Sequence, residues 1–161
     1  MPLTETQRKT LLAIADTLIA PLSEAAVGDI LAALPASDPA VVTEFCQRSA
    51  TQTAGVAEDL ERTILNPDWV PPDVASEVGL LLSVLGTSAG TFALCGHFQP
   101  FCDLTQSERE QALLGFKASL LGAKRKAFMS LKSLICLRTF LSSENHSVMG
   151  FEAPPGREAA R

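Results

Sequence analysis

The stretch VGLLLSVLGTSAGTFALC, from Val78 to Cys95, decides the fold, because it runs 18 residues without a charge. A run of this length exceeds a buried strand and predicts a helix. Its apolar residues cover most of the helix circumference, so we expect other elements to surround it on nearly every side. Half of its residues are small or hydroxylated, and Gly86 and Gly90 form a GxxxG spacing that permits close helix contacts. We therefore interpret it as the buried central helix of a bundle, with a short membrane span as the alternative.

Amphipathic patterns on both sides of this stretch predict the other helices. Capping boxes at Thr4 with Gln7 and at Thr105 with Glu108 mark two helix starts, and Asp38 followed by proline marks another. No segment alternates as a strand would. The predicted helices span residues 4–20, 23–34, 39–65 with a break near Gly55, 73–95, and 107–141 with a bend near Gly122. These patterns predict an all-α, single-domain bundle of five to seven helices over residues 1–144, followed by an irregular or disordered tail over 145–161.

Composition and charge narrow the function classes. The 161 residues are 47% hydrophobic with a net charge of −5, which leaves no basic footprint for nucleic acid. The amino end, MPLTETQRK, has no apolar signal-peptide core. The four cysteines are widely spaced and form no CxxC, so we expect reduced thiols and a cytoplasmic location.

Four stretches, in this order, carry a family resemblance: LTETQRKTLLAIADTLIAPL (3–22), GTFALCG (90–96), FCDLTQSEREQALLGFKASLLGAKRKAFMSLKSL (101–134) and VMGFEAPP (148–155). Together they resemble the amino-terminal helical region of fungal and plant long-chain alcohol oxidases over residues 3–155. The piece AIADTLI is also similar to small helical subunits of membrane-bound gluconate-type dehydrogenases. The resemblance implies a helical module that accommodates long apolar chains.

The chain departs from those oxidases where their chemistry resides. Their flavin-binding portion and catalytic residues follow the segment that VMGFEAPP resembles. This sequence contains no GxGxxG, and GTSAG (86–90) lies inside a predicted helix with the wrong spacing. We therefore expect no flavin or other cofactor and no alcohol oxidation by this chain alone.

Reactive side chains gather in one predicted loop. Cys95, His97, Cys102 and Asp103 contain the ligand types of a zinc site and the ingredients of a Cys-His pair. Their spacing matches no common zinc pattern, so we expect no metal and interpret them as buried thiols and a loop histidine.

Asp16 lies at the edge of the apolar face of the first helix, where a carboxylate needs a partner. Arg109 and Arg125 are the candidates for that partner. A structural ion pair is favoured over a catalytic acid.

The remaining candidate is an apolar cavity beside the central helix, in which hydroxyls and one imidazole contact a bound molecule. A fully packed core is the alternative. The candidate catalytic residues are His97, Thr91 and Asp16, and the candidate substrate-binding residues are Trp69, Thr87, Ser88, Phe92, Cys95, Phe98, Phe101 and Arg125.

Two function classes fit this inventory. The first is a cofactor-independent cyclase or pericyclase, of Diels–Alder type, that orients a hydrophobic terpenoid or polyketide intermediate in fungal natural-product biosynthesis. The second is non-catalytic: a helical partner or small subunit of a separate flavin-dependent alcohol oxidase or dehydrogenase, or a lipid-binding adaptor. In the adaptor, the basic run Lys124, Arg125 and Lys126 would make a peripheral membrane contact, although a solvated helix face is the favoured interpretation of this run. The expected partner is a hydrophobic small molecule; the oligomeric state stays open.

Overall fold

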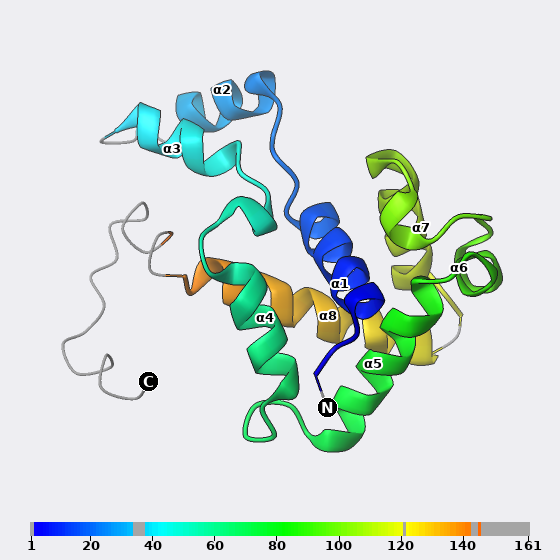
Figure 1. The fold of residues 1–161 in the computed structure, drawn as a ribbon. Coiled ribbons are helices and arrows are strands. Elements are labelled where there is room, and N and C mark those ends of the chain that lie inside the picture. The colour runs from blue at the N-terminus through cyan, green and yellow to red at the C-terminus, as the bar shows by residue number, and fades with distance from the viewer. Residues whose placement is uncertain (1, 34–37, 121, 143–144, 146–161) are drawn as a thin grey trace.

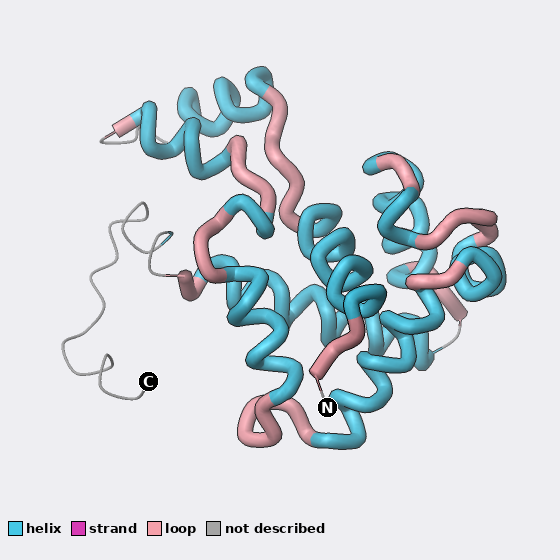
Figure 2. Tube along the Cα trace, in the orientation of Figure 1, coloured by secondary structure: helices cyan, strands magenta, loops and turns pink. Residues whose placement is uncertain are grey.

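The computed structural model describes residues 2–33, 38–120, 122–142 and 145. These residues form eight α-helices, two short 3₁₀ helices and no strand (Figures 1 and 2). The all-α class is confirmed. The elements are α1 (Glu5–Leu18), α2 (Glu24–Ala33), α3 (Pro39–Cys46), η1 (Ala50–Gln52), α4 (Val56–Leu65), α5 (Pro72–Leu85), α6 (Ser88–Cys95), η2 (Phe101–Asp103), α7 (Gln106–Lys117) and α8 (Gly122–Phe140).

Helix α1 occupies the centre of the bundle (Figure 1). It contacts α5, α7, α8, η1 and η2, and its Leu11, Ile14 and Ala15 are fully buried. The predicted capping box starts it: the Thr4 N–H donates to Gln7 Oε1 at 2.7 Å, and the Gln7 N–H donates to Thr4 Oγ1 at 3.3 Å. The organising helix of the bundle is therefore α1 and not the stretch from residue 78 to 95.

The prediction of one continuous central helix from Val78 to Cys95 is wrong. The stretch contains the end of α5 and all of α6, and the two helices are bent by 102°. Nor is it surrounded, because Leu80 is 67% exposed and Phe92 is also exposed. In the described part of the chain, no single helix has the length and apolar character of a membrane span; only this bent pair passes that test.

Hydrogen bonds at the α5–α6 corner explain the bend. The Thr87 hydroxyl accepts from the Gly90 N–H at 3.1 Å and donates to the Val84 carbonyl at 2.9 Å, so it caps the start of α6. The buried Thr91 hydroxyl donates to the Leu85 carbonyl at 2.8 Å. Both hydroxyls thus satisfy carbonyls that a helix end leaves without intrahelical partners.

The GxxxG spacing serves contacts within the chain. A Cβ on Gly86 would lie 2.4 Å from Thr6 Cγ2, so this glycine lets α1 approach the end of α5. The same two helices are joined by Gln7, whose Nε2 donates to the Gly79 carbonyl at 2.9 Å and to Ser83 Oγ at 2.8 Å. A Cβ on Gly90 would lie 2.0 Å from the Val84 carbonyl oxygen, which the corner cannot accommodate.

The other predicted breaks fall where local signals place them. Gly55 adopts a left-handed φ of 76° directly before α4, and Gly96 adopts a φ of 81° at the end of α6. The long carboxy-terminal pattern divides into α7 and α8, which begins at Gly122. Helices α2 and α3 pack on each other and extend from one end of the bundle (Figure 1). The predicted tail over 145–161 lies outside the described residues, apart from Asn145.

Candidate functional site

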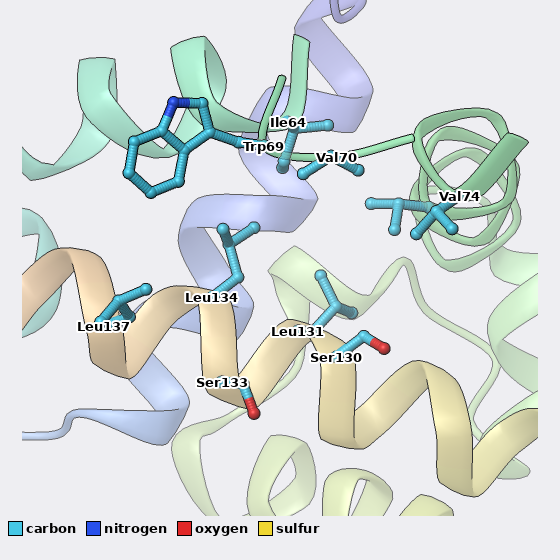
Figure 3. A pocket seen from close by; sticks show the side chains of 10 residues that line it. Ile64, Trp69, Val70, Val74, Ser130, Leu131, Ser133, Leu134 and Leu137 are labelled. Atoms are coloured by element: carbon cyan, nitrogen blue, oxygen red, sulfur yellow. The ribbon is translucent and has the colours of Figure 1, made fainter. Parts of the chain in front are cut away.

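An apolar hollow of about 230 Å³ lies between α8 and the segment that joins α4 to α5 (Figure 3). Figure 3 shows Leu131 and Leu134 pointing from α8 toward Ile64 and Val70, whereas Ser133 points away from them. The walls of this hollow, named here the Trp69 hollow, are therefore almost entirely apolar. Its lining residues are Ile64, Trp69, Val70, Val74, Val78, Ser130, Leu131, Ser133, Leu134 and Leu137.

A tight turn places the only tryptophan of the chain beside this hollow. The Asn66 side chain accepts from the Asp68 N–H at 2.9 Å, and the Asn66 carbonyl accepts from the N–H groups of Trp69 at 3.1 Å and Val70 at 2.9 Å. Pro71 follows this turn and a second proline begins α5; neither has a backbone N–H, so neither can continue the hydrogen bonds of the turn. The loop is thus fixed by its own backbone contacts, although the Trp69 side chain is 59% exposed.

Arg138 of α8 lies over the Trp69 ring, with its Cζ 4.4 Å from the ring centroid. Such cation–π contacts contribute about 0.5–1 kcal/mol at exposed sites. The Arg138 Nε is buried and has no hydrogen-bond partner. This cation therefore stands at the edge of the Trp69 hollow with donor capacity unused.

A second hollow of about 300 Å³ lies between the end of α1, α3 and the end of α8. The Thr139 hydroxyl in its lining is buried without a hydrogen-bond partner, and two thiols also line it. Its lining residues are Leu18, Ile19, Ala20, Leu22, Phe45, Cys46, Arg48, Thr53, Cys136, Thr139, Phe140 and Asn145.

The structure does not bring the predicted site residues together in either hollow. Trp69 alone among them lines one, and it lies before the start of α5. Thr87 and Thr91 lie beyond the other end of that 14-residue helix. At 1.5 Å per residue the two ends are about 21 Å apart.

The predicted hydroxyl contacts on α6 are already used by the fold. Thr91 is fully buried and bonds to the Leu85 carbonyl, and Thr87 is the α6 cap, so neither hydroxyl faces a cavity as predicted. Ser88 is an exposed residue of the first α6 turn. Phe92 is exposed and stacks on Phe98, with ring centroids 4.0 Å apart.

His97 and Phe101 do not form a rim. Phe101 is completely buried in the core and lines neither hollow. His97 Nδ1 lies 3.9 Å from Glu108 Oε1, which is an ion-pair distance rather than a hydrogen bond. Glu108 completes the predicted α7 capping box, and hydrogen bonds from Thr105 hold the pKa of its carboxyl below the usual value.

The expected arginine partner of Asp16 is also wrong. The Thr51 N–H and hydroxyl donate to the Asp16 carboxylate at 2.9 and 2.8 Å, so Asp16 fixes the start of η1. Arg125 instead donates to the Ser119 carbonyl at 2.6 Å, and Arg109 donates to Gln106 at 3.2 Å. Neither Asp16 nor Arg125 faces either hollow.

The predicted basic run also has a structural use. Lys124 donates to the Leu94 carbonyl at 2.9 Å, in the last turn of α6, and lies over the Phe116 ring. A cation in this position satisfies a helix-terminal carbonyl and complements the helix dipole. Arg125 donates to the Ser119 carbonyl, so of the three basic residues only the exposed Lys126 makes no side-chain hydrogen bond or ion pair with the described residues.

Both thiols of the predicted reactive loop have a raised pKa. Burial raises the pKa of the Cys95 thiol, which Lys124 offsets only in part. Burial and the neighbouring Asp103 raise the pKa of Cys102, whose Sγ lies 3.5 Å from the Asp103 carboxylate. Across the described residues, no three His, Cys, Asp or Glu side chains are grouped as metal ligands would be.

Comparison with protein-family models, with curated proteins and with solved structures finds no match for this chain. The resemblance to the long-chain alcohol oxidases therefore rests on the four quoted stretches alone.

Sequence reasoning missed most residues of the Trp69 hollow. Val70 lies between two predicted helices, Val74 lies at the predicted start of the helix over 73–95, and Leu134 lies in the predicted helix over 107–141, so none of the three stands out as a site residue. One signal was available: a tryptophan confined between prolines, in NPDWVPPD (66–73), is held in place without being buried.

Proposed function

We propose that the protein binds an apolar, unsaturated intermediate of terpenoid or polyketide type in the Trp69 hollow and promotes its ring closure without a cofactor. The observation that carries this proposal is the hollow itself. Its walls are one indole and aliphatic side chains with two serines, Ser130 and Ser133, which is the mostly apolar lining that apolar ligands require. Its volume of about 230 Å³ lies below the range typical of drug-sized ligands, so it fits a small molecule or the reacting part of a larger one.

The reaction class follows from what such a lining supplies. In an intramolecular Diels–Alder closure, two σ bonds form as two π bonds are lost, and no atom, proton or electron leaves the molecule. The protein then has to fold the diene against the dienophile and hold it there. Correct orientation of reacting groups lowers a barrier by about 7–11 kcal/mol in favourable cases. Rigid walls from α4, α5 and α8 suit that task.

The test compares ring closure with and without protein. A triene ester that closes slowly in water is incubated with the wild type and with two variants, Trp69→Ala and Phe98→Ala. Both side chains are exposed aromatics, but only Trp69 lines the hollow. We expect acceleration and an altered product ratio with wild type and Phe98→Ala, and at least a tenfold smaller rate with Trp69→Ala. Unchanged rate and stereochemistry with the wild type across terpenoid and polyketide trienes would overturn the proposal.

A second candidate, a non-catalytic partner of a flavin-dependent alcohol oxidase or dehydrogenase, is favoured by a different observation. Apolar side chains on and between α6, α7 and α8 face solvent: Phe98 is 75% exposed, Leu120 is 97% exposed, and Phe92 and Leu114 are also exposed. Sedimentation of the chain with a purified oxidase, alone and as the Phe98→Asp variant, tests this candidate. A complex that Phe98→Asp abolishes supports it, and independent sedimentation of the two proteins contradicts it.

A further inference from the structure

The indole that lines the Trp69 hollow also contacts a cation, Arg138, which makes no hydrogen bond to the described residues. We propose that the ligand of this hollow is a carboxylic acid, with the apolar body in the hollow and the carboxylate on the Arg138 guanidinium. This inference rests on the proposed function for the location of the ligand, and it names the class of molecule that binds there.

Arg138 differs from the other arginines that the structure describes. No hydrogen bond from Arg138 and no carboxylate within 4.0 Å of it occurs among those residues; its Nε is buried without a partner, as is the Nε of Arg109. Every other described arginine pairs with an oxygen: Arg8 with Glu58 and Glu61, Arg48 with Glu44, Arg62 with Asp59, Arg109 with Gln106 and Arg125 with Ser119.

The contact with Trp69 leaves the relevant part of the guanidinium free. Stacking on an aromatic ring uses the face of the planar group, whereas its N–H donors point outward in that plane. A carboxylate accepts two parallel hydrogen bonds from such an edge, a geometry that arginine favours. Because the Nε is buried, the donors left for such a carboxylate are the N–H groups of the two terminal nitrogens.

The position of Arg138 on α8 matches such a ligand. It follows Leu137 directly and lies one turn beyond Leu134, both of which line the hollow. From Leu131 to Arg138 the helix advances seven residues, or roughly 10 Å at 1.5 Å per residue. An apolar body lying along this row therefore brings a terminal carboxylate to the guanidinium.

The test uses geranic acid and methyl geranate, which share an unsaturated apolar body and differ in charge. The chain has one tryptophan and no tyrosine, so its indole fluorescence reports on the surroundings of Trp69, which lines the hollow. We expect the acid to bind the wild type roughly tenfold to a hundredfold more tightly than the ester, as a charge-assisted hydrogen bond implies. Arg138→Met, which keeps the apolar stem, should remove this preference and leave the affinity for the ester unchanged.

Two further variants separate a recognition role from a structural one. Arg138→Lys keeps the charge but not the planar fork, so we expect it to retain only part of the preference for the acid. Arg62→Met removes an exposed arginine of α4 that pairs with Asp59, and it should bind both ligands as the wild type does. Far-UV circular dichroism of each variant shows whether the helices are retained.

The outcomes distinguish the two proposals. Equal binding of acid and ester, with both changing the fluorescence of the wild type, overturns the carboxylate inference and leaves the apolar site standing. A preference for the acid that survives Arg138→Met overturns the assignment to Arg138. If neither molecule changes the fluorescence, ligand binding in the Trp69 hollow fails, and both proposals fail with it.

Discussion

Replacing Gly90 by alanine tests the account of the corner on which the arrangement of α5 and α6 depends. A Cβ at this position would lie 2.0 Å from the Val84 carbonyl oxygen and 2.7 Å from its carbonyl carbon. Both are backbone atoms, so no rotation of a side chain relieves the contact. The first turn of α6 must move away from α5, and this movement strains the buried bond from the Thr91 hydroxyl to the Leu85 carbonyl.

The expected change in the free energy of unfolding combines three terms. Overpacking costs about 1–3 kcal/mol. Leaving a buried hydroxyl and carbonyl unpaired costs about 1–3 kcal/mol. The higher helix propensity of alanine relative to glycine adds about 1 kcal/mol to the stability and offsets part of this loss. Gly90→Ala should therefore destabilise the protein by about 3 kcal/mol, a large part of the 5–15 kcal/mol typical of a domain.

Urea unfolding followed by circular dichroism measures this change, and Gly115→Ala is its control. A Cβ on Gly115, in the exposed part of α7, meets nothing within 4 Å. The same substitution there should stabilise the protein by about 0.5–1 kcal/mol. With a denaturant slope of about 2 kcal/mol per molar, the Gly90→Ala midpoint should fall by about 1.5 M while the control rises slightly. If the two variants unfold at the same midpoint, the steric account of the corner is refuted.

Three further predictions concern polar contacts. Asp16→Ala should lower the free energy of unfolding in urea by about 1–3 kcal/mol, because both Thr51 donors lose their acceptor. Asp16→Asn should lower it less, because one side-chain oxygen remains. Equal losses in the two variants would contradict the assignment of these hydrogen bonds. Thr105→Ala should cost about 1 kcal/mol by removing the α7 cap. The pKa of Glu108 is lowered in the folded state, so its contribution to the free energy of unfolding is present above its unfolded pKa and is lost as the pH falls through its folded pKa. In Thr105→Ala the free energy of unfolding should therefore fall less steeply as the pH is lowered. Burial raises the pKa of Cys95, so in the native protein this thiol should react with iodoacetamide only at a higher pH than it does in urea. Mass spectrometry of the labelled peptide measures this difference. The contribution of Cys95 to the free energy of unfolding is present below the pKa of the unfolded thiol and is lost as the pH rises through the pKa of the folded one.

The helix boundaries that could be predicted from the sequence are those set within a few residues of the chain. The boxes at Thr4 and Thr105 and the proline after Asp38 each satisfy helix-end groups locally, so their signatures are sufficient. Gly96 ends α6 for a similar reason, through its left-handed φ.

The corner at Gly86 could not be predicted with the same rules, because the signals compete. An apolar run of this length favours a continuous helix, whereas glycine followed by threonine favours an end and a new start. The contact of Gly86 with Thr6 on α1 contributes to the outcome, and it joins residues 80 positions apart. The same corner separates the candidate site residues: Trp69 lies before α5, whereas Thr87, Ser88, Thr91 and Phe92 lie beyond its other end.

Helix α8 carries apolar residues that are not buried in the core and line the two hollows instead. The sequence pattern of α8 predicts that its apolar residues form one buried stripe. In the structure, however, Leu134 is only partly buried and Leu137 is exposed. These two line the Trp69 hollow, while Cys136 and Phe140 line the second hollow. Leu137 and the Trp69 indole are both exposed beside this hollow, and contiguous apolar surface of this kind is a feature of ligand-binding grooves. In the proposed function a bound apolar molecule along α8 would cover these side chains, so binding at Trp69 is the property that most directly tests the proposal.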